Sequence, residues 1–166
     1  MTADSYDSLN IADTRCGGNT ETSDAFTCGE AGIYPSYIVT HRATTNTIYL
    51  FNESDYSASG YWPCGVVNLM DGQALDTAYD SGDDVEIWEV GCNAIIYVHC
   101  IAATPAPTYS KNVVIVASAT DGYGKPFAYT AGTDYLVSPL LKIGRVHERK
   151  AGSTTDAKLI KVRMSD

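Results

Sequence analysis

The segment Leu159-Ile-Lys-Val-Arg-Met164 decides the class of fold, because apolar and basic side chains alternate along it. Successive side chains of a β-strand point to opposite faces, so every second residue of this segment shares a face. The residues expected on the core face are Ile160, Val162 and Met164, and those expected on the outer face are Leu159, Lys161 and Arg163. Such alternation is typical of a strand with one face in the core and the other toward water.

Short apolar runs separated by turn-forming residues recur upstream of that segment. The strands that we expect lie at 34–40, 47–51, 62–69, 85–90, 94–101, 113–117, 140–146 and 158–164. The run 113–117 is apolar throughout, which predicts a strand buried on both faces. The runs 85–90 and 94–101 are close enough in sequence to form a hairpin.

Helical signals are weak in this sequence. Only residues 73–79 are a candidate for a helical turn, and the composition of 52–60 predicts a loop. The recurring strand-length runs predict an all-β domain, a small β-barrel or β-sandwich, over residues 33–166. Residues 1–32 are rich in Asp, Ser, Thr and Gly, which predicts an extended acidic arm or an irregular loop.

The charge of the chain restricts its partners. It carries 11 Lys and Arg against 20 Asp and Glu, a formal net charge of −9, which argues against nucleic-acid binding. Residues 1–100 hold 15 acidic and 2 basic residues (−13), whereas 101–166 hold 5 acidic and 9 basic residues (+4). This uneven distribution is either a solvated acidic surface or a means of orienting the protein on a partner.

Neither a membrane segment nor a secretory leader is expected. No stretch approaches the roughly 20 apolar residues that a spanning helix needs, and the start at Met1 has no basic region or apolar run. We therefore expect the protein to be made in a cytoplasm. Five cysteines without a leader argue against a disulfide framework, although Cys16 and Cys28 remain a pair that oxidising conditions could join.

The sequence contains no recognisable catalytic or metal-binding motif. The histidines His41, His99 and His147 lie in different expected strands or strand ends, and no HxH, HExxH, CxxC or GxSxG spacing occurs. A pair of Cys64 with His99 or His147 stays open, but nothing nearby indicates an activated thiol. We therefore expect a protein that is not an enzyme, with no catalytic residue, no cofactor and no metal.

Two charged clusters and two tryptophans have functional interpretations. Asp80-Ser-Gly-Asp-Asp84 is an oxygen-rich turn that suits calcium, but it lacks the EF-hand spacing, and a solvated acidic turn is the simpler interpretation. Arg145, Arg149 and Lys150 form a basic patch that would suit an acidic neighbour in an assembly. Trp62 and Trp88 are candidates for stacking on sugar rings, although strand tryptophans more commonly pack in the core.

The stretch from Lys111 to Met164 resembles the C-terminal part of capsid decoration, or cement, proteins of tailed bacterial and archaeal viruses. The resemblance rests on the apolar run at 113–117, the turn Asp121-Gly-Tyr-Gly-Lys125, the segment Leu141-Lys-Ile-Gly-Arg-Val-His-Glu148 and the basic alternating strand that ends at Met164. Upstream, the segment that begins Gly82-Asp-Asp-Val85 is similar to the strand start of the same proteins. The resemblance covers roughly half of the chain and is one of pattern.

The resemblance implies a β-tulip-like barrel on the exterior of a virion. Such proteins form homotrimers, bind the major capsid protein and clamp neighbouring coat subunits without contacting nucleic acid or a membrane. An arm that becomes ordered on docking would cross a subunit boundary. A different class of function stays open, a carbohydrate- or ligand-binding β-sandwich of a viral fibre or appendage, and a small hydrolase is the third.

Overall fold

The structure, a computed structural model, describes residues 12–13, 25–42, 46–70, 72–101, 109–127, 141–147 and 158–164. Most regular structure in these residues is β-strand, which confirms the predicted all-β class. The strands are β1 (Ala12–Asp13), β2 (Phe26–Cys28), β3 (Ile38–His41), β4 (Thr47–Leu50), β5 (Pro63–Val67), β6 (Asp84–Val85), β7 (Ile87–Glu89), β8 (Ile95–Cys100), β9 (Val114–Ala117), β10 (Gly124–Pro126), β11 (Lys142–Val146) and β12 (Lys158–Arg163), and the helix is α1 (Glu53–Ser59). Among the described residues, no helix has the length and apolar character that crossing a membrane requires.

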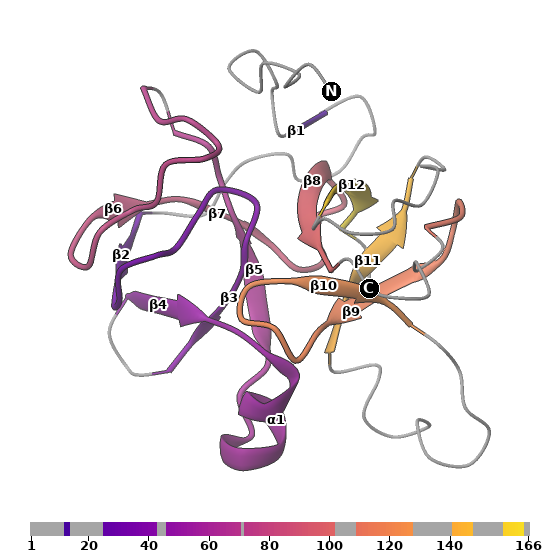
Figure 1. The fold of residues 1–166 in the computed structure, drawn as a ribbon, viewed down its shortest axis with the longest axis horizontal. Helices are drawn as coiled ribbons and strands as arrows, with labels where there is room; N and C mark the ends of the chain where they lie inside the picture. Colours follow the sequence, from indigo (N-terminus) through magenta and orange to yellow (C-terminus); the bar gives the residue numbers. More distant parts are fainter. Residues whose placement is uncertain are drawn as a thin grey trace.

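Strands β8 to β12 form a closed barrel, which we call the barrel. Its strand order is β8-β10-β9-β11-β12, and β12 pairs back onto β8 to complete the circle (Figure 1). The antiparallel register of that closing pair runs from Ile95 opposite Arg163 to Cys100 opposite Lys158. β1 adds to the opposite edge of β8, where Ala12 lies across from Ile96.

The alternation along β12 fills the barrel as the sequence predicts. Ile160, Val162 and Met164 are fully buried, and Val162 lies opposite Ile96 of β8, whose side chain is also buried. The outer face differs from the prediction at one position. Leu159 is only 7% exposed, because it packs against Leu75 of a neighbouring turn rather than facing water.

Strands β2 to β7 form a second sheet, which we call the mixed sheet, in the order β6-β2-β4-β3-β5-β7. It contains one parallel pair, β2 with β4, among antiparallel neighbours. The two outermost strands, β6 and β7, are halves of one chain segment interrupted at Glu86. Because β6 pairs with β2 and β7 pairs with β5, the bend at Glu86 brings the two ends of the sheet together and rolls it around its own core.

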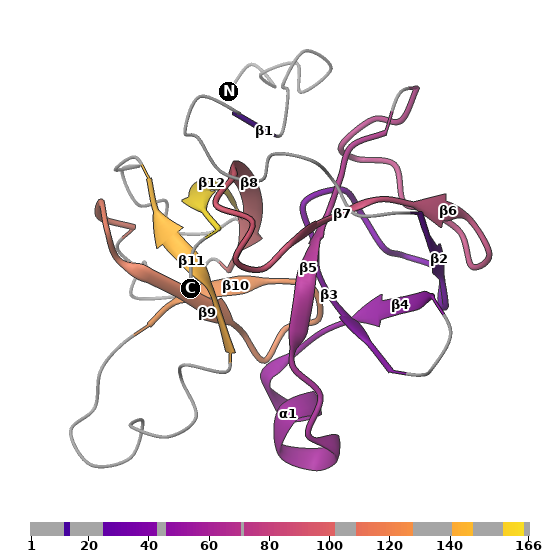
Figure 2. The ribbon, with the colours of Figure 1, turned by 180° about the vertical axis from the view of Figure 1, so that it is seen from behind.

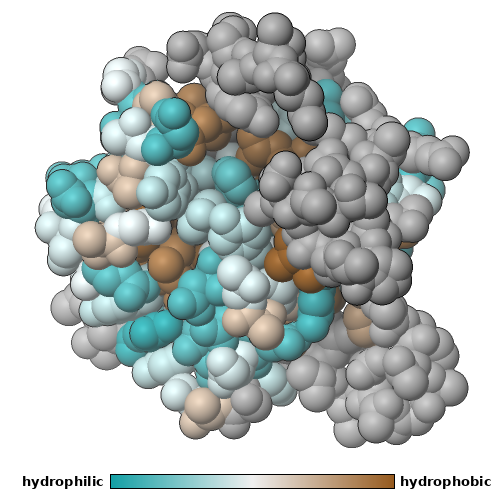
Figure 3. Space-filling model, in the orientation of Figure 1, coloured by the Kyte–Doolittle hydropathy of each residue, from teal (hydrophilic) through white to brown (hydrophobic). Residues whose placement is uncertain are grey.

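The barrel and the mixed sheet lie side by side and share one hydrophobic core (Figure 2). Ile38, Phe51, Val66 and Trp88 of the mixed-sheet side join the buried cluster that contains the barrel residues. A second cluster lies inside the rolled mixed sheet; its fully or almost fully buried members are Cys28, Ile33, Val39, Ile48, Val67, Tyr79, Val85 and Ile87. On the face shown in Figure 3, the mixed-sheet side is largely hydrophilic, with hydrophobic residues in small separate patches.

Hydrogen bonds fasten the two sheets along a line that we call the seam. The turn between β9 and β10 reaches the mixed sheet. There the Gly122 carbonyl accepts from the Ile38 N–H at 2.8 Å, and the Gly122 N–H donates to the Phe51 carbonyl at 2.9 Å. Gly122 has a φ of 75°, and an added Cβ would lie 2.5 Å from the ring of Tyr37, so the position needs glycine. The backbone N–H of His99 on β8 donates to the Ser36 carbonyl at 3.0 Å.

Helix α1 belongs to the seam, and the prediction of a loop at 52–60 is wrong. Asn52 caps its first turn, since the side chain accepts from the N–H groups of Ser54 and Asp55 while the Asp55 carboxylate accepts from the Asn52 N–H. This reciprocal capping box stabilises a helix whose body is otherwise polar. The helix attaches to the barrel through the Glu53 N–H, which donates to Ser118 at 2.9 Å, and through an ion pair between Glu53 and Lys125.

Two further predictions about elements are wrong. Residues 85–90 and 94–101 do not form a hairpin, because β7 pairs with β5 in the mixed sheet and β8 pairs within the barrel. The described residues of 73–79 contain turns and no helix. The boundary at residue 32 stays a prediction. Within the range 1–32, residues Phe26–Cys28 form β2, which is a strand of the mixed sheet.

Candidate functional site

The described cysteines are buried or half-buried thiols that stay protonated. Cys100 lies fully buried in the shared core, and burial raises its pKa. Burial, followed by the carboxylates of Asp83 and Asp84, raises the pKa of Cys28 to about 11. A nucleophilic cysteine needs the thiolate, so these thiols are poor nucleophiles at neutral pH. The possible partner of Cys28, Cys16, lies outside the described residues.

Cys64 and His99, one of the two histidines that the sequence left open as its partners, have different surroundings. Burial raises the pKa of Cys64 to about 12, and its thiol donates to the Val39 carbonyl at 3.4 Å. His99 lies elsewhere, packed edge-on against the rings of Tyr37 and Tyr123 at 5.0 and 5.8 Å. Burial lowers the pKa of His99 to about 4, and its Nδ1 has no hydrogen-bond partner. A protonated thiol and a neutral, enclosed imidazole do not form an activated nucleophile pair of Cys64 with His99.

The acidic turn at Asp80–Asp84 uses its oxygens within the protein. The Asp83 carboxylate accepts from the Asp80 N–H at 2.8 Å, and Asp84 accepts from the Thr27 hydroxyl at 3.5 Å. Within the ranges that the structure describes, no group of three or more His, Cys, Asp or Glu side chains is arranged to hold a metal ion. Arg145 of the basic patch donates to the Asn112 carbonyl at 3.3 Å, whereas Arg149 and Lys150 lie outside the described residues.

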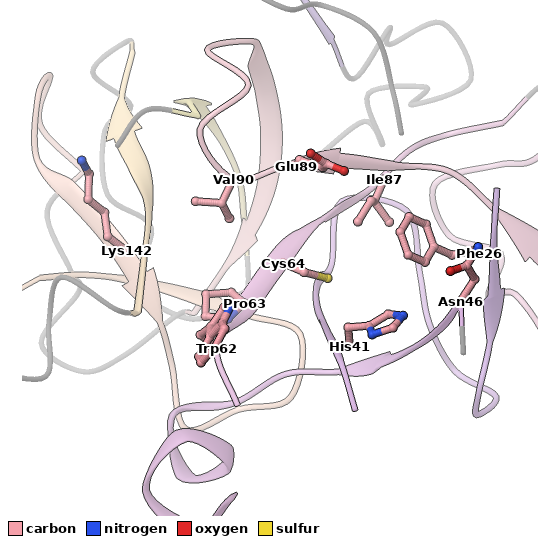
Figure 4. A pocket seen from close by; sticks show the side chains of 10 residues that line it. All are labelled: Phe26, His41, Asn46, Trp62, Pro63, Cys64, Ile87, Glu89, Val90 and Lys142. Carbon is pink, nitrogen blue, oxygen red and sulfur yellow. The ribbon is translucent and has the colours of Figure 1, made fainter. Parts of the chain in front are cut away.

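An open groove of about 720 Å³ lies at one end of the rolled mixed sheet. The strand directions explain its position, because the starts of β2, β4 and β5 meet the ends of β3 and β7 at that end. Lys142 of β11 lies on the side next to the barrel, and its side chain extends away from the other labelled residues (Figure 4). The lining residues are Phe26, His41, Asn46, Trp62, Pro63, Cys64, Ile87, Glu89, Val90 and Lys142. The mouth of a rolled sheet is a common place for a ligand.

Trp62 is the unusual residue of this groove. Its side chain is 61% exposed, and no other large hydrophobic side chain in the described ranges is classed as exposed. The backbone beside it is held in place, since the buried Thr40 hydroxyl donates to the Trp62 carbonyl at 2.8 Å and the next residue, Pro63, begins β5. Trp88, the other tryptophan, is 6% exposed, and its indole N–H donates to the Asn68 side chain at 3.0 Å. Of the two candidates for stacking, only Trp62 is available.

The groove combines an aromatic surface with polar groups that could contact a ligand. It presents an aromatic surface at Trp62, an edge-to-face pair of Phe26 and His41 with centroids 5.8 Å apart, and polar ends at Asn46, Glu89 and Lys142. The thiol of Cys64 in its wall is protonated, as its raised pKa shows. The sequence singles out Trp62 as a candidate for stacking, but it gives no signal for the groove as a whole. The lining residues come from five separate strands and the connections beside them. Compared with known proteins, the chain matches no family model, and no curated protein matches it either.

Proposed function

We propose that this chain is a virion structural protein that binds the outside of a capsid lattice and cements neighbouring coat subunits. Its partners would be the major capsid protein and further copies of itself, in a homotrimer. The observation that supports this most directly is the seam. A protein that holds neighbours together transmits force through its own body, so its halves must not separate.

The seam supplies that resistance in two ways. Buried side chains from both sheets form one cluster, so separating the sheets would expose the apolar surface of residues such as Phe51 and Trp88 to water. Backbone hydrogen bonds cross the boundary at Ile38, Phe51 and Glu53, where the polar groups would also lose their partners. A rigid body of this kind is suited to structural attachment.

The distribution of charge gives the proposed body an orientation. All strands of the mixed sheet lie in the part of the chain with a formal charge of −13, and β9 to β12 of the barrel lie in the part with +4. A molecule with unlike ends aligns in the electric field of a charged lattice before it docks. This supports attachment in one orientation, as a decoration protein requires.

The test is to locate the chain in its native source. An antibody against the purified protein should detect it, after density-gradient centrifugation, in the fraction that holds DNA-filled particles, and electron microscopy should place it on their exterior. Light scattering of the purified chain should give the molar mass of a trimer. Detection only in the soluble fraction, with the particles free of the chain, would refute the proposal.

The proposed arm needs a deletion that spares β2. Removal of residues 1–24 takes away the two-residue strand β1, which pairs with the edge of β8, and leaves Ala25 and the strand at Phe26–Cys28 in place. We expect the shortened chain to fold, with an unchanged melting temperature to within a few degrees, and to occupy particles at a lower level than the full chain. Full occupancy by the shortened chain would contradict a role for the arm.

The carbohydrate- or ligand-binding alternative has its own support, which is the groove with the exposed Trp62. It does not exclude the structural role, because the groove and the seam use different residues.

A further inference from the structure

The exposure of Trp62 needs an explanation that packing does not give. An indole that is 61% exposed leaves a large apolar surface in water, where other large hydrophobic side chains of the described residues are at least partly covered. Tryptophan is well suited to binding sites because its flat apolar face and polar N–H can both be used by a ligand. The fixed backbone at Thr40 and Pro63 lowers the entropy lost when that face is covered.

The polar residues of the groove narrow the chemistry of the ligand. Asn46 offers an amide, His41 an imidazole, Glu89 a carboxylate and Lys142 an ammonium group, so both donors and acceptors are present. The lining holds one formal negative charge, that of Glu89, and one formal positive charge, that of Lys142, so the groove has no excess of either sign. A phosphate or carboxylate ligand would meet the Glu89 carboxylate, and a purely apolar ligand would desolvate polar groups without replacing their hydrogen bonds.

We infer that the groove binds a short neutral oligosaccharide, with one sugar ring stacked on Trp62 and the hydroxyl groups of the neighbouring rings hydrogen-bonded by Asn46 and Glu89. A sugar ring has an apolar face of C–H groups and a rim of hydroxyls that both donate and accept, which matches an aromatic surface surrounded by mixed polar groups. The groove volume of about 720 Å³ lies within the range typical of small-molecule sites. The inference does not depend on the proposed capsid role, and its test uses the isolated chain.

The first experiment is a binding screen with the purified full chain. The probes are immobilised neutral oligosaccharides, including cellotriose, maltotriose and chitotriose, with sialyllactose as the anionic comparison. We expect at least one neutral oligosaccharide to bind and sialyllactose to bind more weakly. No binding to any probe, or binding to sialyllactose alone, would overturn the inference.

The second experiment places the bound sugar on Trp62. The chain has two tryptophans, and only Trp62 is exposed, so ligand stacking should change the intrinsic fluorescence through that residue. Trp62→Ala should weaken the binding of the hit from the screen by about tenfold or more, a loss that corresponds to one aromatic contact. Trp62→Phe should retain part of the affinity and abolish the fluorescence change.

A matched pair of carboxylate variants controls for surface charge. Glu89→Ala removes a carboxylate from the groove, whereas Asp76→Ala removes an exposed one from a turn that does not line it. We expect a several-fold loss of affinity from Glu89→Ala and no change from Asp76→Ala. If folded Trp62→Ala binds the saccharide as well as the wild type does, the inference is refuted. The same applies if the groove proves to hold a segment of the coat protein instead.

Discussion

The barrel is closed by hydrogen bonds between β8 and β12, whereas the mixed sheet is closed by the chain itself, which bends at Glu86 from β6 into β7. A hydrogen-bonded closure runs along the full length of a strand pair, so it leaves little room between neighbours. A closure by a bent segment joins the two ends of the sheet at one point and lets the strands spread on either side of it. The groove lies at one end of the sheet that is closed in this second way.

The two sheets also differ in how their hydrophobic side chains are buried. The barrel contributes buried aliphatic residues to the shared core, such as Ile96, Ile115 and Ile160. The mixed sheet keeps an internal cluster of its own and exposes Trp62 at its open end. If the barrel stabilises the whole molecule while the mixed sheet carries an adaptable site, substitutions in the two sheets should differ in their effects.

The largest expected effect is that of Val162→Asp. Val162 is fully buried in the shared core, so a carboxylate there should lower the free energy of unfolding by more than about 4 kcal/mol or prevent folding. Because Trp88 of the mixed sheet is in the same cluster, its fluorescence should be lost together with the far-UV circular dichroism. The neighbouring variant Lys161→Asp, on the opposite face, should cost under about 1 kcal/mol. A mixed-sheet signal that survives in Val162→Asp would show that the two sheets are independent.

A pH effect at His99 should be the next largest. The pKa of its folded form is about 4, below the ordinary value of 6.5, so the unfolded chain takes up a proton first as the pH falls. Stability from this source is complete above pH 6.5, declines between 6.5 and 4, and is lost by at most about 3 kcal/mol below that. Urea unfolding of wild type and His99→Phe at pH 7, 5.5 and 4 isolates the effect. Parallel pH profiles for the two proteins would contradict it.

A matched pair of glycine substitutions compares how far the two sheets can yield. An added Cβ would lie 2.1 Å from the Arg163 carbonyl at Gly144, and 2.6 Å from the Trp88 carbonyl at Gly65. Each substitution to alanine would push two neighbouring strands apart and should lower the free energy of unfolding by about 1 to 3 kcal/mol. We expect Gly144→Ala to be the more destabilising in thermal unfolding, because the barrel is closed by hydrogen bonds and the mixed sheet is not. The reverse order would show that the rolled sheet is the stiffer half.

The smallest effect tests the seam. Asn52→Ala removes the helix cap and should lower the free energy of unfolding by about 1 kcal/mol. Lys125→Ala breaks a partly exposed ion pair and should cost less than that. Because α1 joins the mixed sheet to the barrel, hydrogen exchange in Asn52→Ala should increase around Glu53 and Ser118 more than inside the barrel. Uniform exchange rates across the seam would mean that the helix only covers it.

The sequence predicts the strands well and their connections poorly. Alternation fixed the buried face of β12 because each side chain there faces either the core or the outside. The bend at Glu86 could not be foreseen, since 85–90 has a continuous strand pattern and the choice of partners is made by tertiary packing. Helix α1 was missed for a different reason. The segment has no apolar residues at helical spacing. Its only helix signals are the capping box of Asn52 and Asp55 and the glycine at the C-terminal end, Gly60.

The candidate site was less predictable than the fold. Trp62 could be singled out as a residue type, but Trp88 had the same claim from sequence, and burial separates them only in three dimensions. The sequence left His99 and His147 open as partners of Cys64, whereas the histidine that lines the same groove is His41. Contacts among five strands depend on register and on the way the sheet rolls, and neither is encoded within a short window of residues.

The bend at Glu86 also bears on aggregation. Sheets with long, unpaired outer strands tend to add strands from other molecules. Here the outermost strands of the mixed sheet, β6 and β7, are two and three residues long and carry the exposed carboxylates of Asp84 and Glu89. A protein crowded side by side on any surface would be protected from indiscriminate strand exchange with its neighbours by that arrangement.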